Sequence, residues 1–104
     1  MTKQILALAL LLTTLGASAC SKDPEVAKRE FLQSGDKYAT ENKYKEAVIE
    51  YRNAVQQDPR FGEARLKLAE TYEKLGDAQN AYGEYIRAAM TMSTRWLART
   101  GQIK

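Results

Sequence analysis

The amino-acid sequence repeats itself at an offset of 34 residues, and this repeat limits the folds open to the chain. The identical pairs include Tyr38 and Tyr72, Ala47 and Ala81, Glu50 and Glu84, Tyr51 and Tyr85, and Ala54 and Ala88. Periods of about 20 to 50 residues are typical of proteins that stack copies of one small structural unit. The repeat therefore predicts a stacked fold in which each copy buries one face against the next.

Capping residues and apolar spacing divide the two copies into predicted helices. Asp23 and Asp58 each precede a proline, which is typical of a helix start because the carboxylate caps the first turn and proline suits its backbone. Gly76 followed by Asp77 indicates the end of one helix and the cap of the next. Apolar residues recur at helical spacing and no stretch alternates with a period of two, so no sheet is expected. The predicted helices span residues 24–40, 43–57, 59–75 and 78–92.

The spacing of small and bulky residues resembles that of the tetratricopeptide repeat (TPR), a helix–turn–helix unit. The matching positions are Phe31, Gly35, Tyr38, Ala47, Tyr51, Ala54 and Pro59 in the first copy, and Leu68, Ala69, Tyr72, Ala81, Tyr85 and Ala88 in the second. Arg65 and Ser93 depart from the family, which has a bulky residue and a proline there. The resemblance implies an all-α, TPR-type α-solenoid of two repeats in which small residues let the helices approach and tyrosines fill the gaps. Its predicted segments are a signal peptide (1–19), a tether (20–25), two repeats (26–61 and 62–93) and an atypical tail (94–104).

The first 19 residues have the pattern of a signal peptide. Lys3 supplies the positive charge, residues 5–15 form a short apolar run, and residues 16–19 are small. Cys20 follows directly, which resembles the bacterial lipobox and implies lipidation of that cysteine, although Ala17 stands where the lipobox usually has leucine. Cleavage by the ordinary signal peptidase, giving a soluble periplasmic protein, is the alternative. In the lipoprotein family, Ser21 after the cysteine implies sorting to the outer membrane, facing the periplasm.

Charge and residue types exclude several classes of function. Residues 20–89 carry 12 basic and 13 acidic side chains, so the body lacks the basic face of a nucleic-acid-binding protein. The chain has no histidine and one cysteine, which excludes Cys/His zinc sites and Ser-His or Cys-His catalytic pairs. No phosphate loop, metal cluster or nucleophile motif is visible. We expect no enzyme, no cofactor and no metal.

In the TPR family the first helix of each repeat lines a concave groove that holds a peptide. The resemblance places these candidates on that groove: Arg29, Leu32, Gln33, Asp36 and Ala39 in the first repeat, and Glu63, Leu66, Lys67, Glu70 and Glu73 in the second. The family's Lys/Asn clamp for a C-terminal carboxylate is disfavoured, because Leu32 and Asp36 stand where it would start. The repeated glutamates Glu50 and Glu84 are expected to be solvated. The expected partner is a protein or peptide.

The end of the sequence leaves two hypotheses open. The chain is either a truncated piece of a longer repeat protein, or Trp96 and Leu97 fold back as a short capping helix. Both predict an exposed apolar edge on the last helix and a tendency to self-associate. The expected function is a membrane-anchored interaction scaffold of the bacterial envelope, similar to TPR lipoproteins that accompany exopolysaccharide and exosortase-type (PEP-CTERM) sorting systems. The alternatives are a soluble periplasmic adaptor and a non-functional fragment.

Overall fold

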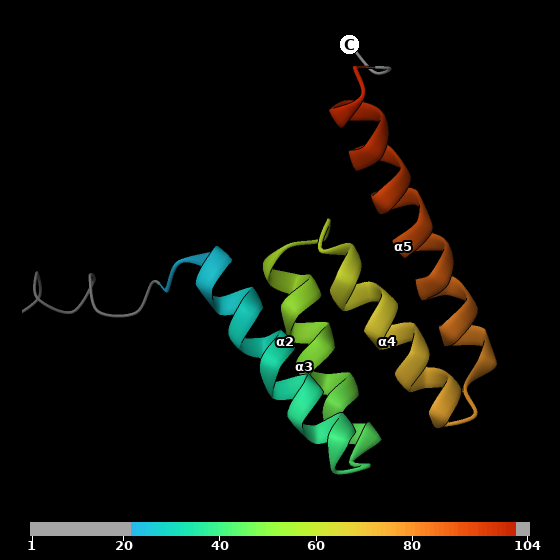
Figure 1. Ribbon diagram of the computed structural model, residues 1–104. Helices are drawn as coiled ribbons and strands as arrows, with labels where there is room; N and C mark the ends of the chain where they lie inside the picture. Colours follow the sequence, from blue (N-terminus) through green and yellow to red (C-terminus); the bar gives the residue numbers. More distant parts are fainter. Residues whose placement is uncertain (1–21, 102–104) are drawn as a thin grey trace, which may run out of the picture.

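The computed structural model describes residues 22–101, which form four α-helices and, within that range, no strand. The helices are α2 (Pro24–Thr40), α3 (Tyr44–Gln57), α4 (Gly62–Lys74) and α5 (Ala78–Arg99). They run alternately up and down, and each packs against the next in sequence (Figure 1). The predicted all-α, TPR-type helical repeat is confirmed. The predicted signal peptide and Cys20 lie outside the described residues.

The start of α2 agrees with the sequence prediction. The Asp23 carboxylate accepts a hydrogen bond from the Glu25 backbone N–H at 3.0 Å, and Pro24 occupies the first turn. This satisfies one of the N–H groups that a helix start leaves without an internal partner. Beyond the C-terminal end of α2, Asn42 adopts a positive φ of 59° and turns the chain into α3.

The predicted start of α4 at Pro59 is wrong, because α4 begins at Gly62. Asp58 ends α3, and its Oδ1 accepts a hydrogen bond from the Arg60 N–H at 3.0 Å, which closes a tight turn. Its other oxygen, Oδ2, lies 2.8 Å from Lys28 Nζ. With both oxygens engaged elsewhere, Asp58 does not cap α4, and Pro59 lies exposed in the turn instead of packing between helices.

The last helix is longer than predicted and does not fold back. α5 continues without a break from Ala78 to Arg99, through the predicted boundary at residue 93, so the hypothesis of a short capping helix is wrong. The family's proline is replaced by Ser93, which keeps its backbone N–H and permits the helix to continue. Arginine, leucine and alanine in the following turns favour helix.

The core lies mainly between α2, α3 and α4 and combines small and bulky side chains. Its buried residues are Leu32, Ala47, Val48, Tyr51, Ala54, Ala64 and Leu68, and its half-buried residues are Phe31, Tyr38, Ala39, Val55, Phe61 and Tyr72. Ala69, Ala81, Ala88 and Gly35 are buried as well, while Tyr85 is half-buried. The buried alanines bring the helix backbones close together, and the tyrosine rings fill the space that remains.

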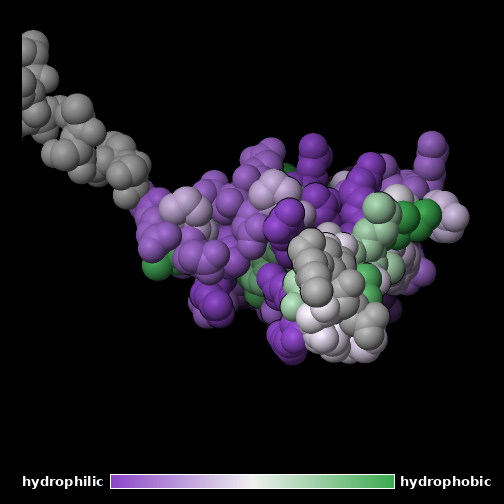
Figure 2. Space-filling view, turned by 90° about the horizontal axis from the view of Figure 1, so that it is seen from above, coloured by the Kyte–Doolittle hydropathy of each residue, from purple (hydrophilic) through white to green (hydrophobic). Residues whose placement is uncertain are grey.

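Most of the surface is polar, with an apolar face on α5. Figure 2 shows hydrophilic side chains over most of the visible face and hydrophobic ones gathered on the side of α5. On α5 the side chains of Tyr82, Ile86, Met90 and Trp96 are exposed, which confirms the predicted apolar edge on the last helix. Among the described helices, α5 included, none combines the length and the apolarity needed to cross a membrane.

Candidate functional site

Asp36 of α2 and Lys67 of α4 meet on the face formed by the first helices of the two repeats. Lys67 Nζ lies 2.8 Å from both carboxylate oxygens of Asp36. The Tyr51 hydroxyl of α3 donates to Asp36 Oδ1 at 2.6 Å. Burial raises the pKa of Tyr51, and the hydrogen bond to Asp36 raises it further. Asp36 therefore links three helices and fixes the second repeat relative to the first.

A shallow depression of about 270 Å³ surrounds this ion pair. Its lining residues are Asp36, Ala39, Tyr44, Tyr51, Lys67, Glu70, Thr71 and Lys74. Charges of both signs stand on its wall, and tyrosines of α3 form the apolar part. An open groove with this mixture suits a peptide, whose backbone and side chains offer donors, acceptors and apolar groups together.

The predicted groove residues fall into three groups. Arg29, Gln33, Glu63, Glu70 and Glu73 are exposed; Asp36, Ala39, Leu66 and Lys67 are half-buried; Leu32 is buried in the core. Leu32 is therefore not available to a ligand in the groove, and its prediction as a groove residue is wrong. It lies one turn before Gly35, on the face of α2 that packs against α3. Asp36, Ala39, Lys67 and Glu70 are the predicted residues that line the depression.

Three residues that line the depression were not predicted from the sequence. Thr71 and Lys74 lie on the same side of α4 as Lys67 and Glu70, four residues further on in each case. Residues four apart share a helix face, so this spacing was sufficient to find them. Tyr44 begins α3 and donates to Asn42 Oδ1 at 2.9 Å. The sequence offered no signal for Tyr44, because its position depends on how α3 packs against α2.

A second cluster joins α2 to the turn between α3 and α4. Lys28 is buried, and its Nζ lies 2.8 Å from Asp58 Oδ2 and 2.9 Å from Glu25 Oε1. The ammonium group also lies 4.9 Å from the centre of the Phe61 ring, a cation–π distance. The hydrogen bond to Asp58 raises the pKa of Lys28, and the hydrogen bond from Lys28 lowers the pKa of Asp58. The Lys28 side chain is 8% exposed and its ammonium group is engaged by Asp58, Glu25 and Phe61, so we assign the cluster a role in stabilising the repeat.

We expect Asp58→Asn to lower the free energy of unfolding at neutral pH by about 2 kcal/mol, the usual range for a hydrogen bond to a charged group. Because the pKa of Asp58 is lowered in the folded state, its contribution is complete above the ordinary value of 3.8 and disappears as the pH falls through the folded value. Because the pKa of Lys28 is raised, its contribution is complete below 10.5 and disappears as the pH rises through the folded value. Urea unfolding between about pH 2 and pH 11 measures both limits.

The control for this experiment is Glu46→Gln, which changes an exposed carboxylate on α3. It is expected to change the free energy of unfolding by less than about 0.5 kcal/mol. A loss of stability by Glu46→Gln equal to that of Asp58→Asn would contradict the assignment, since it would show a general effect of negative charge.

Arg65, which departs from the TPR pattern, is compensated by Glu84 on the neighbouring helix. Arg65 Nη1 lies 2.9 Å from Glu84 Oε2, and each side chain is 14% exposed. Arg65 Nε also donates to the Pro59 carbonyl at 2.9 Å. The prediction that Glu84 is solvated is therefore wrong: an ion pair between α4 and α5 takes the place of the family's bulky residue.

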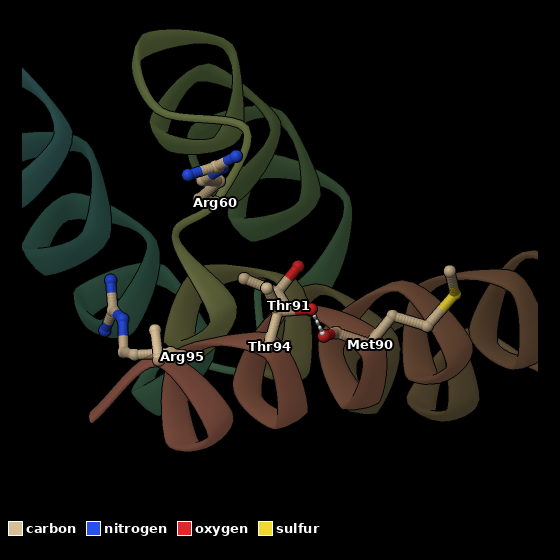
Figure 3. A pocket seen from close by; sticks show the side chains of 6 residues that line it. Arg60, Met90, Thr91, Thr94 and Arg95 are labelled. Carbon is tan, nitrogen blue, oxygen red and sulfur yellow. Dashed lines mark hydrogen bonds between the residues drawn. The ribbon is translucent and has the colours of Figure 1, made fainter. Parts of the chain in front are cut away.

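A further cavity of about 410 Å³ lies between the α3–α4 turn and the second half of α5. Figure 3 shows Arg60 on the turn and, along the helix, Arg95, then Thr94 and Thr91, then Met90. The Thr94 hydroxyl donates to the Met90 carbonyl at 2.9 Å, so it is engaged within the helix. Within residues 22–101, no three carboxylate or thiol side chains gather closely enough to hold a metal ion.

A comparison with known protein families finds one that matches the central part of the chain. Residues 35–76 match the family described as TPR repeat, a stretch that includes the Asp36–Lys67 pair and Tyr51. This match supports a TPR protein. TPR proteins are generally non-enzymatic scaffolds that commonly bind other proteins. No curated protein matches the sequence.

Proposed function

We propose that the chain is a protein-interaction scaffold that holds an extended peptide in the groove between α2 and α4. The observation that carries the proposal is the mixed-charge depression around Asp36 and Lys67, within the stretch that matches the TPR repeat. Lys67 already neutralises Asp36 at 2.8 Å; Glu63 lies 4.0 Å from the same ammonium group but is 59% exposed, and Glu70 is exposed on the same helix. This arrangement favours a partner with basic side chains.

The spacing of the exposed carboxylates suggests the form of the ligand. Glu63 and Glu70 are seven residues apart, so they lie about 10 Å apart along α4 at 1.5 Å per residue. A peptide extended in the polyproline II conformation rises about 3.1 Å per residue with three residues per turn, so basic side chains three residues apart share one face and span about 9 Å. We therefore propose an extended segment with basic residues at positions i and i+3.

Glu70→Lys is expected to weaken partner binding about tenfold, because one attractive contact becomes repulsive and about 1.4 kcal/mol corresponds to that factor. The measurement is capture of crosslinked partners from envelope membranes by the full chain, followed by titration of the captured peptide. Glu46→Lys is the matched control, since it makes the same charge change on an exposed site of α3, away from the groove. Equal binding by the two variants would count against the groove.

We also propose that Cys20 carries a lipid that anchors the scaffold in the outer membrane, where it serves exopolysaccharide or protein-sorting machinery. The proposal rests on the signal-peptide pattern of residues 1–19 and on the lone cysteine that follows it. More than one acyl chain gives stable anchoring, whereas a single chain binds reversibly. Mass spectrometry of the mature N-terminus is expected to find acylated Cys20. An unmodified Cys20 would instead support the soluble periplasmic adaptor.

A further inference from the structure

One face of α5 carries apolar side chains that the other described helices leave uncovered. Tyr82, Ile86 and Trp96 are 69%, 41% and 59% exposed. With Ala89 and Ser93 between them, they follow one another at alternating intervals of four and three residues. This is the spacing of the seam in a two-stranded coiled coil, in which side chains of one helix fit between those of another. We call these five residues the α5 seam.

The C-terminal part of α5 extends beyond the helix that supports it. Gly62 is the first residue of α4, and a Cβ added to it would lie 3.1 Å from Met92 Cγ. The contact between α4 and α5 therefore ends near Met92. Residues 93–99 continue α5 for about 10 Å past this point (Figure 1). Trp96 projects from this segment. Within residues 93–99 only Leu97 is half-buried and the others are exposed, and short helical segments with little tertiary packing are marginal in water, so a second molecule that packs there would stabilise this one.

An apolar depression lies at the other end of the same helix. It has a volume of about 490 Å³ and is lined by Glu73, Gly76, Ala78, Ala81, Tyr82 and Tyr85. Two tyrosine rings and two alanines give it apolar walls. Glu73 stands on its wall; its Oε2 accepts from the Tyr85 hydroxyl at 2.8 Å, and its Oε1 offers an acceptor for an indole N–H, which needs a partner when it is buried. The molecule thus has an exposed tryptophan at one end of α5 and a cavity suited to an aromatic ring at the other.

Charge follows the same division along α5. Arg95 and Arg99 lie in its last turns, and from Met90 to the end of the described residues there is no acidic side chain. The opposite end has Glu73 and Lys74 in the last turn of α4 and Asp77 in the α4–α5 turn, so its net charge is −1. A helix that is basic and aromatic at one end, and acidic and hollow at the other, complements a second copy of itself in the antiparallel direction. Such an interface is isologous and closes as a dimer.

We propose that a second copy of the chain covers the α5 seam, with the two α5 helices antiparallel about a two-fold axis between Ile86 and Ala89. In this register Ile86 opposes Ala89 of the partner subunit, and Tyr82 opposes Ser93 of the partner subunit, so a large side chain meets a small one in each layer. Trp96 then reaches the depression beside Ala78 of the partner subunit, and Arg99 lies near its acidic α4–α5 turn. This inference does not depend on the peptide groove.

The first test is the molecular mass of the full exported chain in detergent, measured by sedimentation equilibrium over a hundredfold range of concentration. A dimer is expected for the unchanged protein. Ile86→Asp and Trp96→Ala are each expected to raise the dissociation constant at least tenfold. Ile49→Asp is the matched control, because Ile49 is an equally apolar, 57% exposed side chain on α3. Circular dichroism confirms that each variant is folded.

The second test fixes the register. A Tyr82→Cys chain is mixed with a Ser93→Cys chain under oxidising conditions, and mass spectrometry of the linked peptides separates these cross-links from any that involve Cys20. Disulfide-linked heterodimers are expected, with little linkage of Tyr82→Cys to itself, since antiparallel packing keeps the two copies of residue 82 well apart. A monomer at all concentrations, equal effects of Ile49→Asp and Ile86→Asp, or efficient self-linkage of Tyr82→Cys would each overturn the proposal. So would a different protein bound to the seam of a monomeric chain.

Discussion

Replacing Tyr51 by alanine is expected to lower the free energy of unfolding by about 4 kcal/mol, as large-to-small changes of buried aromatic residues do. The Tyr51 ring is 2% exposed and belongs to the core cluster between α2, α3 and α4. Its hydroxyl donates to Asp36, which also pairs with Lys67. The substitution therefore creates a cavity and removes one support of the carboxylate that joins the repeats. Urea unfolding followed by circular dichroism measures the loss.

Two further variants separate the contributions of the ring and the hydroxyl. Tyr51→Phe keeps the ring and removes one hydrogen bond, so a loss of about 1 kcal/mol is expected. Val26→Ala shortens an exposed side chain on α2 and is expected to change stability by less than about 0.5 kcal/mol. A Tyr51→Ala variant that unfolds at nearly the same urea concentration as Val26→Ala would show that the ring does not support the core.

The loss expected for Tyr51→Ala is large compared with the stability of such a domain. Globular proteins are stable by about 0.05–0.15 kcal/mol per residue, so 80 ordered residues correspond to roughly 4 to 12 kcal/mol. A repeat protein with only two copies buries few interfaces between copies. We therefore expect Tyr51→Ala to leave a substantial fraction of the protein unfolded at 37 °C, unless dimer formation through the α5 seam adds stability.

The repeat fold was predictable because its signals are local or strictly periodic. The offset between Tyr38 and Tyr72 and the small residues at Gly35 and Ala47 define the helix pairs without any knowledge of distant contacts. The start of α4 was not predictable in this way. Asp58 and Pro59 form an ordinary helix start in the sequence, but Lys28, thirty residues earlier, binds the carboxylate. The start of α4 is therefore determined by a tertiary contact and not by local helix propensity.

The candidate groove shows the same division. The resemblance to the TPR family placed Asp36, Lys67 and Glu70 on one groove, and they do line one depression. The same reasoning wrongly assigned Leu32 to the groove, because the boundary between groove and core depends on where α3 covers α2. The pairing of Arg65 with Glu84 was equally hidden, since the two residues belong to different helices that the sequence alone does not align.

Gly35→Ala is expected to lower the free energy of unfolding by about 3 kcal/mol, although alanine normally favours helix over glycine by about 1 kcal/mol. A Cβ at this position would lie 2.5 Å from Tyr51 Cε1 and 2.6 Å from Cδ1. The ring has little room to retreat, because it is buried in the core and its hydroxyl is held by Asp36. Either α2 and α3 move apart or the ring leaves its position, and both changes open the core.

Gly83→Ala on α5 is the matched control, because it makes the same chemical change within a helix. There the added Cβ would meet only the guanidinium end of Arg87 at 3.3 Å, and that flexible side chain is exposed. We expect Gly83→Ala to raise the free energy of unfolding by about 0.5–1 kcal/mol, so the two substitutions differ in sign. Urea unfolding of both variants measures this difference. If Gly35→Ala were also stabilising, the close approach of α2 to Tyr51 would be wrong, and with it the packing that holds Asp36 against Lys67 at the floor of the groove.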